Sequence, residues 1–203
     1  VALALFFSAC TANDHIVQSD GIDLFDKFVA RIVVSESALA HEATALKFIP
    51  GSSEFLLLAK GGIIHHFALL DSGAQELGSL IVPEVAPAPG EIGLVGLTFD
   101  PDFGSNRFVY LCYTSGDNKW NRIVRLRWSN DYAAVVQSIR LVIQVDRVFP
   151  DEPQHGIYDV AFGADGMLYA AIGDATQPEF SQYPESLLGK LIRIKPDHDD
   201  DGG

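Results

Sequence analysis

Short apolar segments, separated by clusters of glycine, proline, asparagine and aspartate, follow one another along the chain after residue 26. The segments are rich in valine, isoleucine, phenylalanine and tyrosine, which favour β-strands, and each is about as long as one strand. Helical periodicity is nearly absent, and Ser35 to Ala45 is the only modest candidate for a helix. The pattern predicts an all-β protein built from many short strands.

One pattern occurs three times: an apolar strand, a turn rich in proline, glycine or aspartate, and a second apolar strand. Equivalent phenylalanines at 48, 99 and 162 are separated by 51 and 63 residues, spacings that fit four-stranded propeller blades with loop insertions. A third strand follows in each unit, at residues 63–67, 122–126 and 191–194. We therefore predict a partial β-propeller of about three four-stranded antiparallel blades.

The last of these strands alternates, with Ile192 and Ile194 on one face and Arg193 and Lys195 on the other. Such alternation is typical of a sheet with one covered face. A propeller needs more than three blades to close its ring and protect its edges. We expect residues 29–203 to be the N-terminal part of a propeller domain that is truncated at the C-terminus.

The N-terminal residues have a different pattern. An apolar run, residues 1–7, is followed by Ser8, Ala9 and Cys10 and then by a polar spacer, residues 11–28. Small residues before a cysteine are typical of the end of a bacterial lipoprotein signal; an ordinary secretory signal and a buried strand or helix are the alternatives. We expect residues 1–10 to be a signal remnant and the protein to be exported, either periplasmic or lipid-anchored at the cell envelope through Cys10.

The charge balance excludes one class of partner. The formal net charge is -13, with 14 lysines and arginines against 27 aspartates and glutamates, whereas nucleic-acid binding needs clustered basic residues. Apart from Cys10 the only cysteine is Cys112, inside the apolar run 108–113. We expect no disulfide and a buried, inert thiol at Cys112.

Three segments, in order, resemble the soluble sugar dehydrogenases that depend on pyrroloquinoline quinone (PQQ). Residues 93–103, GLVGLTFDPDF, resemble the family's GLLGLAFHPDF, and residues 186–197, SLLGKLIRIKPD, resemble SLLGKILRINPDG. Between them, residues 155–174 resemble the family's histidine, apolar triplet, GPDG and LYVTIGD. The resemblance implies a six-bladed propeller, of which this chain would hold about three blades.

His155 is the main catalytic candidate. It precedes a predicted strand, and a histidine can accept a proton at neutral pH, as the oxidation of an alcohol requires. The resemblance places it at the family's general base; an exposed loop histidine is the alternative. Tyr158 stands where many members have a small glycine, which changes the expected width of the pocket.

Neighbouring residues are weaker candidates. The resemblance places Glu91 at the rim of the cofactor pocket, as a partner of PQQ or of the base, with a solvated loop acid as the alternative. Gln154 is a cofactor-binding candidate because it adjoins His155. Asp174 follows a glycine at the end of a strand, so we favour a turn-capping role for it over a functional one.

The other histidines and aspartates that could bind a metal are weaker candidates. His65 and His66 are consecutive in a strand, so their side chains point to opposite faces and we expect structural roles. The terminal Asp197, Asp199 and Asp201 fit the start of a calcium loop, although a solvated acidic loop is the favoured interpretation. No residue of this chain is assigned as a metal ligand.

The resemblance implies an oxidoreductase that oxidises the C1 hydroxyl of an aldose sugar by hydride transfer to PQQ. It further implies a small sugar as substrate, a soluble electron acceptor, and calcium with ligands mostly beyond residue 203. A non-catalytic propeller of the same lineage that binds carbohydrate or protein is the alternative. A hydrolytic, lactonase-like propeller is a third interpretation, which no residue here selects.

Overall fold

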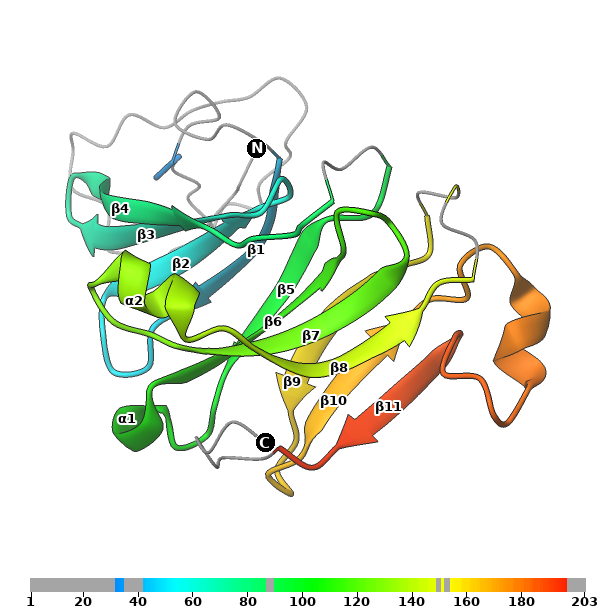
Figure 1. Ribbon diagram of the computed structural model, residues 1–203. Coiled ribbons are helices and arrows are strands. Elements are labelled where there is room, and N and C mark those ends of the chain that lie inside the picture. Colours follow the sequence, from blue (N-terminus) through cyan, green and yellow to red (C-terminus); the bar gives the residue numbers. More distant parts are fainter. Residues whose placement is uncertain (1–31, 35–41, 87–89, 149–150, 152–153, 197–203) are drawn as a thin grey trace, which may run out of the picture.

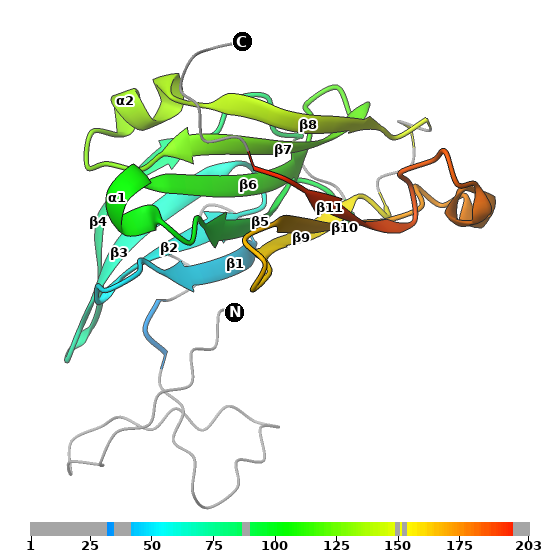
Figure 2. The ribbon, with the colours of Figure 1, turned by 90° about the horizontal axis from the view of Figure 1, so that it is seen from below.

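The computed structural model describes residues 32–34, 42–86, 90–148, 151 and 154–196. They form three antiparallel sheets that follow one another across the molecule, the second lying between the first and the third (Figures 1 and 2). The predicted signal remnant and polar spacer, and the acidic segment 197–201, lie outside the described residues.

The first sheet has the strand order β1-β2-β3-β4, so each strand pairs with the next one along the chain. Its strands are Ala43–Phe48 (β1), Glu54–Ala59 (β2), Ile63–Leu70 (β3) and Gly73–Ile81 (β4). The helix expected at Ser35 to Ala45 is wrong at its C-terminal end, where Ala43 to Ala45 belong to β1. Pairing with β2, which sets Ala45 opposite Leu58, outweighs the weak helical propensity; residues 35–41 lie outside the described part.

The second sheet has the same design and the order β5-β6-β7-β8. Its strands are Leu94–Phe99 (β5), Phe108–Thr114 (β6), Trp120–Arg127 (β7) and Arg140–Asp146 (β8), and two short helices, Phe103–Asn106 (α1) and Tyr132–Gln137 (α2), lie in its connections. The third sheet has the order β11-β10-β9. It contains Ile157–Phe162 (β9), Leu168–Ile172 (β10) and Lys190–Ile194 (β11), with a short 3₁₀ helix, Pro178–Gln182 (η2), before β11.

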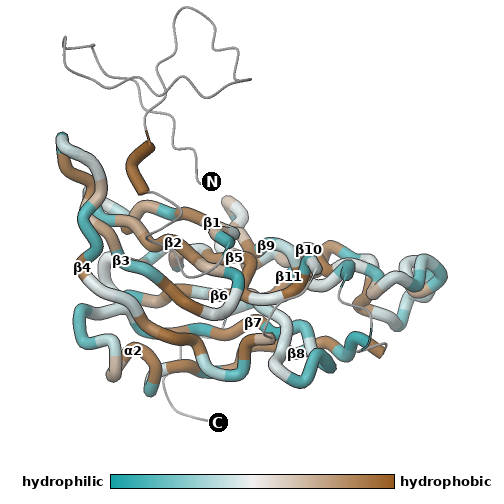
Figure 3. Tube along the Cα trace, turned by 90° about the horizontal axis from the view of Figure 1, so that it is seen from above, coloured by the Kyte–Doolittle hydropathy of each residue, from teal (hydrophilic) through white to brown (hydrophobic). Residues whose placement is uncertain are grey.

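The second sheet contributes to a core on each of its faces. Alternate residues of β6 enter two different cores: Val109 and Leu111 join the core shared with the first sheet, while Tyr110 and Cys112 join the core shared with the third. This explains why β6 is a continuous apolar run instead of an alternating one. Figure 3 shows hydrophobic stretches along strands of all three sheets.

The first strand of each sheet lies near its counterpart, since β5 contacts both β1 and β9. The alternation predicted in β11 is confirmed: Ile192 and Ile194 pack against the core shared with the second sheet, and Arg193 is exposed. No helix among the described residues is long and apolar enough to span a membrane.

Candidate functional site

His155 lies in the loop immediately before β9, and its side chain is 46% exposed. Its backbone is in the left-handed region, with φ of 50°, which costs a residue with a Cβ about 1–2 kcal/mol. Ala175 and Thr176, in the facing loop after β10, also have positive φ, at 53° and 66°. Strained backbone of this kind gathers at functional sites, where the surrounding structure enforces it.

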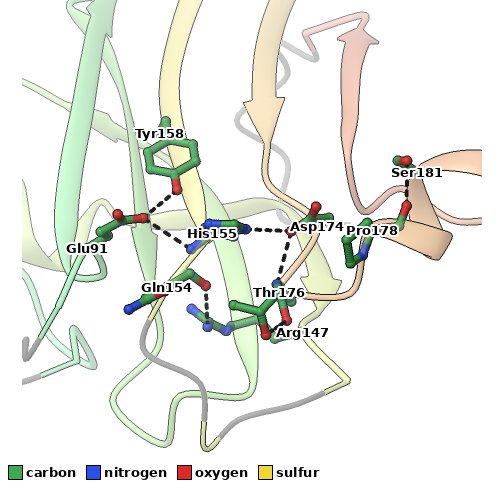
Figure 4. A network of polar contacts seen from close by, with 10 residues as sticks. Glu91, Arg147, Gln154, His155, Tyr158, Asp174, Thr176, Pro178 and Ser181 are labelled. Carbon is green, nitrogen blue, oxygen red and sulfur yellow. Dashed lines mark hydrogen bonds and ion pairs between the residues drawn. The ribbon is translucent and has the colours of Figure 1, made fainter.

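Asp174 binds the imidazole of His155, with Oδ1 2.6 Å from Nδ1 (Figure 4). The two meet because β9 and β10 are antiparallel neighbours, so the loop before β9 and the loop after β10 lie at the same end of the sheet. The same Oδ1 accepts a hydrogen bond from the backbone N–H of Thr176 at 3.0 Å. Asp174 therefore caps its turn, as the sequence indicated, and also holds His155, a role that we did not favour from the sequence.

This contact defines which nitrogen of His155 can act. An ionised carboxylate only accepts hydrogen bonds, so Nδ1 must donate to Asp174, and the neutral imidazole then carries its lone pair on Nε2. Within the described part of the chain, no hydrogen bond reaches Nε2. A half-exposed imidazole with a fixed tautomer and an available Nε2 can take a proton from a bound molecule.

Glu91, in the loop before β5, lies on the other side of His155 (Figure 4). Its Oε2 accepts hydrogen bonds from the Tyr158 hydroxyl at 2.7 Å and from the backbone N–H of His155 at 3.3 Å. The bond from Tyr158, and then the bond from His155, lower the pKa of the Glu91 carboxyl below its ordinary value. Desolvation, and then the bond to Glu91, raise the pKa of Tyr158 to about 12.

Gln154 takes part through its backbone. Its carbonyl oxygen accepts a hydrogen bond from Nη2 of Arg147 at 3.1 Å, while its exposed side chain makes no hydrogen bond within the described part of the chain. The structure places Glu91, from the loop before β5, beside Gln154 and His155, from the loop before β9. Of the three, only Glu91 and His155 have side-chain contacts there.

Two buried polar residues at this site carry no recognisable sequence signal. Arg147 is fully buried, and Asn121 is 1% exposed. Asn121 Oδ1 accepts hydrogen bonds from the backbone N–H of Ile157 at 3.2 Å and from the Thr114 hydroxyl at 3.3 Å. Asn121 is in β7 and Arg147 directly follows β8, and both contact the loop before β9.

His65, His66 and Cys112 lie in the interior of the sheets, as expected. His65 and His66 are 6% and 1% exposed, and they bind Glu76 at 2.7 Å and Glu54 at 2.9 Å. Cys112 is buried, and desolvation raises the pKa of its thiol. Among the residues that the structure describes, no group of three or more histidine, cysteine or acidic side chains is placed to hold a metal.

Comparison with known proteins identifies the family. Residues 40–200 match the family model described as glucose / sorbosone dehydrogenase. The curated aldose sugar dehydrogenase YliI of Escherichia coli strain K12 is 28% identical over 153 residues, which are 74% of this chain and 40% of that protein. The chain thus spans less than half of this relative.

Solved structures agree. The PQQ-bound aldose sugar dehydrogenase of Streptomyces coelicolor is 31% identical with a TM-score of 0.65, and the match covers 83% of this chain and 48% of that one. The soluble aldose sugar dehydrogenase of Escherichia coli, in its apo form, is 26% identical with a TM-score of 0.60, over 75% of this chain and 44% of that one. The predicted partial propeller is confirmed, and the chain belongs to the glucose/sorbosone dehydrogenase family.

Proposed function

We propose that the intact protein is a PQQ-dependent oxidoreductase that oxidises the C1 hydroxyl of an aldose sugar, with His155 as the general base. The observation that carries the proposal is the half-exposed imidazole of His155, whose Nδ1 is held 2.6 Å from Asp174 and whose Nε2 is available. Two relatives are named as aldose sugar dehydrogenases, and one of them was solved with PQQ bound.

His155 and Asp174 have different roles in the proposed reaction. Nε2 of His155 takes the proton of the C1 hydroxyl, and the Asp174 carboxylate stabilises the imidazolium that forms. PQQ, when bound, supplies a quinone that accepts the hydride from the same carbon. Loss of one proton to His155 and of one hydride to the quinone is the two-electron oxidation of a cyclic aldose to its lactone.

The exposed polar groups beside His155 could contact a quinone and a sugar together: the side-chain amide of Gln154 can donate a hydrogen bond to a quinone oxygen, and the Glu91 carboxylate can accept one from a sugar hydroxyl. Beside the available Nε2, the exposed side-chain amide of Gln154 and the ionised carboxylate of Glu91 would border PQQ and the sugar. Calcium, held by ligands outside the described residues, would polarise the quinone. A soluble electron acceptor would reoxidise the reduced cofactor. Export, with a lipid anchor at Cys10, is proposed from the sequence alone.

Reconstitution of the intact protein with PQQ and calcium, followed by dye reduction with a panel of aldoses, tests the proposal. We expect activity in the native protein and its loss in His155→Ala and His155→Asn. Asparagine is the sharper substitution, because it tolerates the left-handed backbone and can hydrogen-bond to Asp174 but cannot act as a base. Absence of dye reduction by folded, PQQ-loaded protein would favour the carbohydrate- or protein-binding alternative, and undiminished activity in both variants would refute the role of His155.

A further inference from the structure

We infer that Arg147 is a positioning residue for His155: its buried guanidinium and the Glu91 carboxylate hold opposite ends of one peptide group and thereby fix the base in its left-handed conformation. The catalytic importance of this arrangement rests on the proposed function, but the arrangement itself can be tested without it.

The peptide group between Gln154 and His155 is held at both ends. Its carbonyl oxygen accepts a hydrogen bond from Nη2 of Arg147 at 3.1 Å, and its N–H donates to Oε2 of Glu91 at 3.3 Å. Arg147 follows β8 and Glu91 precedes β5, so the second sheet supplies both contacts. A peptide group is planar and turns as a unit, so rotating this one would break both hydrogen bonds together.

The next peptide groups are also restrained. The carbonyl of His155 accepts a hydrogen bond from the N–H of Ala175 at 3.1 Å. The Gly156–Ile157 peptide donates to Asn121 Oδ1 at 3.2 Å and accepts from the N–H of Gly173 at 2.6 Å. Of these contacts, those of Arg147, Asn121 and Glu91 are made by side chains that lie in the second sheet or directly beside its strands.

The loop also lies directly against the buried polar groups. A Cβ added to Gly156 would stand 3.2 Å from Thr114 Oγ1, 3.3 Å from Arg147 Nη1 and 3.3 Å from Asn121 Oδ1. Arg147 Nη1 is in turn 3.5 Å from Thr114 Oγ1. The guanidinium therefore lies against the loop, where its planar fork reaches both the Thr114 hydroxyl and the Gln154 carbonyl.

The conformation that is held matters for the imidazole. Turning the Gln154–His155 peptide changes φ of His155, which at 50° is outside the range that a histidine prefers. Relaxation to negative φ would swing the side chain away from Asp174 and release Nδ1. The neutral imidazole would then be free to carry its proton on either nitrogen, and Nε2 would no longer be held as the acceptor.

The test reads the tautomer of His155 by ¹⁵N NMR of the imidazole in the intact protein at mildly alkaline pH, without PQQ or sugar, with the signals assigned by their loss in His155→Asn. In the native protein we expect one tautomer, protonated on Nδ1. In Arg147→Met, which keeps the length of the side chain but removes its charge and donors, we expect both tautomers. Arg147→Lys keeps the buried charge and is the more conservative change for folding. One ammonium cannot replace the planar fork, so we expect a smaller fraction of the second tautomer than in Arg147→Met.

A single unchanged tautomer in the folded Arg147 variants would overturn the inference. If the protein oxidises aldoses, we also expect kcat to fall about tenfold in Arg147→Met while KM changes less than twofold, because the base is displaced and not the sugar. A kcat equal to that of the native protein would contradict the inference as well. Mixed tautomers in a protein without dehydrogenase activity would leave the inference standing and remove only the proposed function.

Discussion

His66, in the first sheet, and His155, before the third, both lie against a carboxylate at hydrogen-bonding distance, 2.9 Å from Glu54 and 2.6 Å from Asp174. They differ in access. His66 is 1% exposed, and its second nitrogen is 3.1 Å from the Tyr132 hydroxyl. The side chain of His155 is 46% exposed and keeps Nε2 available. A histidine–carboxylate contact is therefore no sign of catalysis by itself; exposure and an uncommitted nitrogen separate the two.

The largest expected effect comes from the partner of His155. Asp174→Asn retains an oxygen that can cap the turn, but its amide can donate to the imidazole and favour the wrong tautomer. We expect kcat to fall by about 10²–10⁴-fold, the range that a general base contributes. Steady-state dye reduction measures this.

Asp165→Asn is the matched control for Asp174→Asn. Asp165 also caps a turn of the third sheet, through the N–H of Met167 at 3.1 Å, and it binds Arg193 instead of a histidine. Its kcat should equal that of the native protein. Equal losses in both variants would show that turn capping, and not the contact with His155, determines the rate.

The structural histidine should show the opposite behaviour. His66→Ala removes a buried ring that packs against Trp128 and leaves Glu54 and Tyr132 without that partner. We expect the free energy of unfolding to fall by about 2–4 kcal/mol, while kcat/KM of the folded protein stays the same. Urea denaturation followed by fluorescence measures the first, and dye reduction the second; a loss of kcat without a loss of stability would reverse the assignment.

The smallest effect concerns Glu91. Tyr158→Phe removes the hydroxyl that contributes most to the lowered pKa of Glu91, so this pKa should rise toward its ordinary value, as carboxyl ¹³C NMR can follow. A carboxyl whose pKa is lower in the folded than in the unfolded protein stabilises the fold at pH values above its unfolded pKa. This stabilisation is lost as the pH falls through the folded pKa. The native protein should therefore lose a small advantage over Tyr158→Phe in acid. A pKa that does not move would mean that the hydrogen bond is absent in solution.

The repeats could be read from the sequence because each unit has the same order of apolar strand, turn and apolar strand. Phe48, Phe99 and Phe162 fall in the first strands of the three sheets, β1, β5 and β9. The weak helical propensity of Ser35 to Ala45 misled at Ala43 to Ala45, because their pairing with β2, which lies outside that segment, decides their conformation.

The site could be read only in part. His155 and Glu91 stood in motifs, whereas the second role of Asp174 depends on the pairing of β9 with β10. Arg147 follows an apolar strand whose sequence gives no indication that its guanidinium turns under a loop of the next sheet. Contacts between blades are set by the packing of sheets, which local pattern does not reveal.

The role of His155 as the base is tested most directly by the single-turnover rate at which an aldose reduces bound PQQ, compared between native protein and His155→Asn at equal cofactor occupancy. We expect a fall of about 10²–10⁴-fold with cofactor binding unchanged. A fall of about threefold or less, in a folded and loaded variant, is far smaller than that range and would contradict the assignment of His155 as the base.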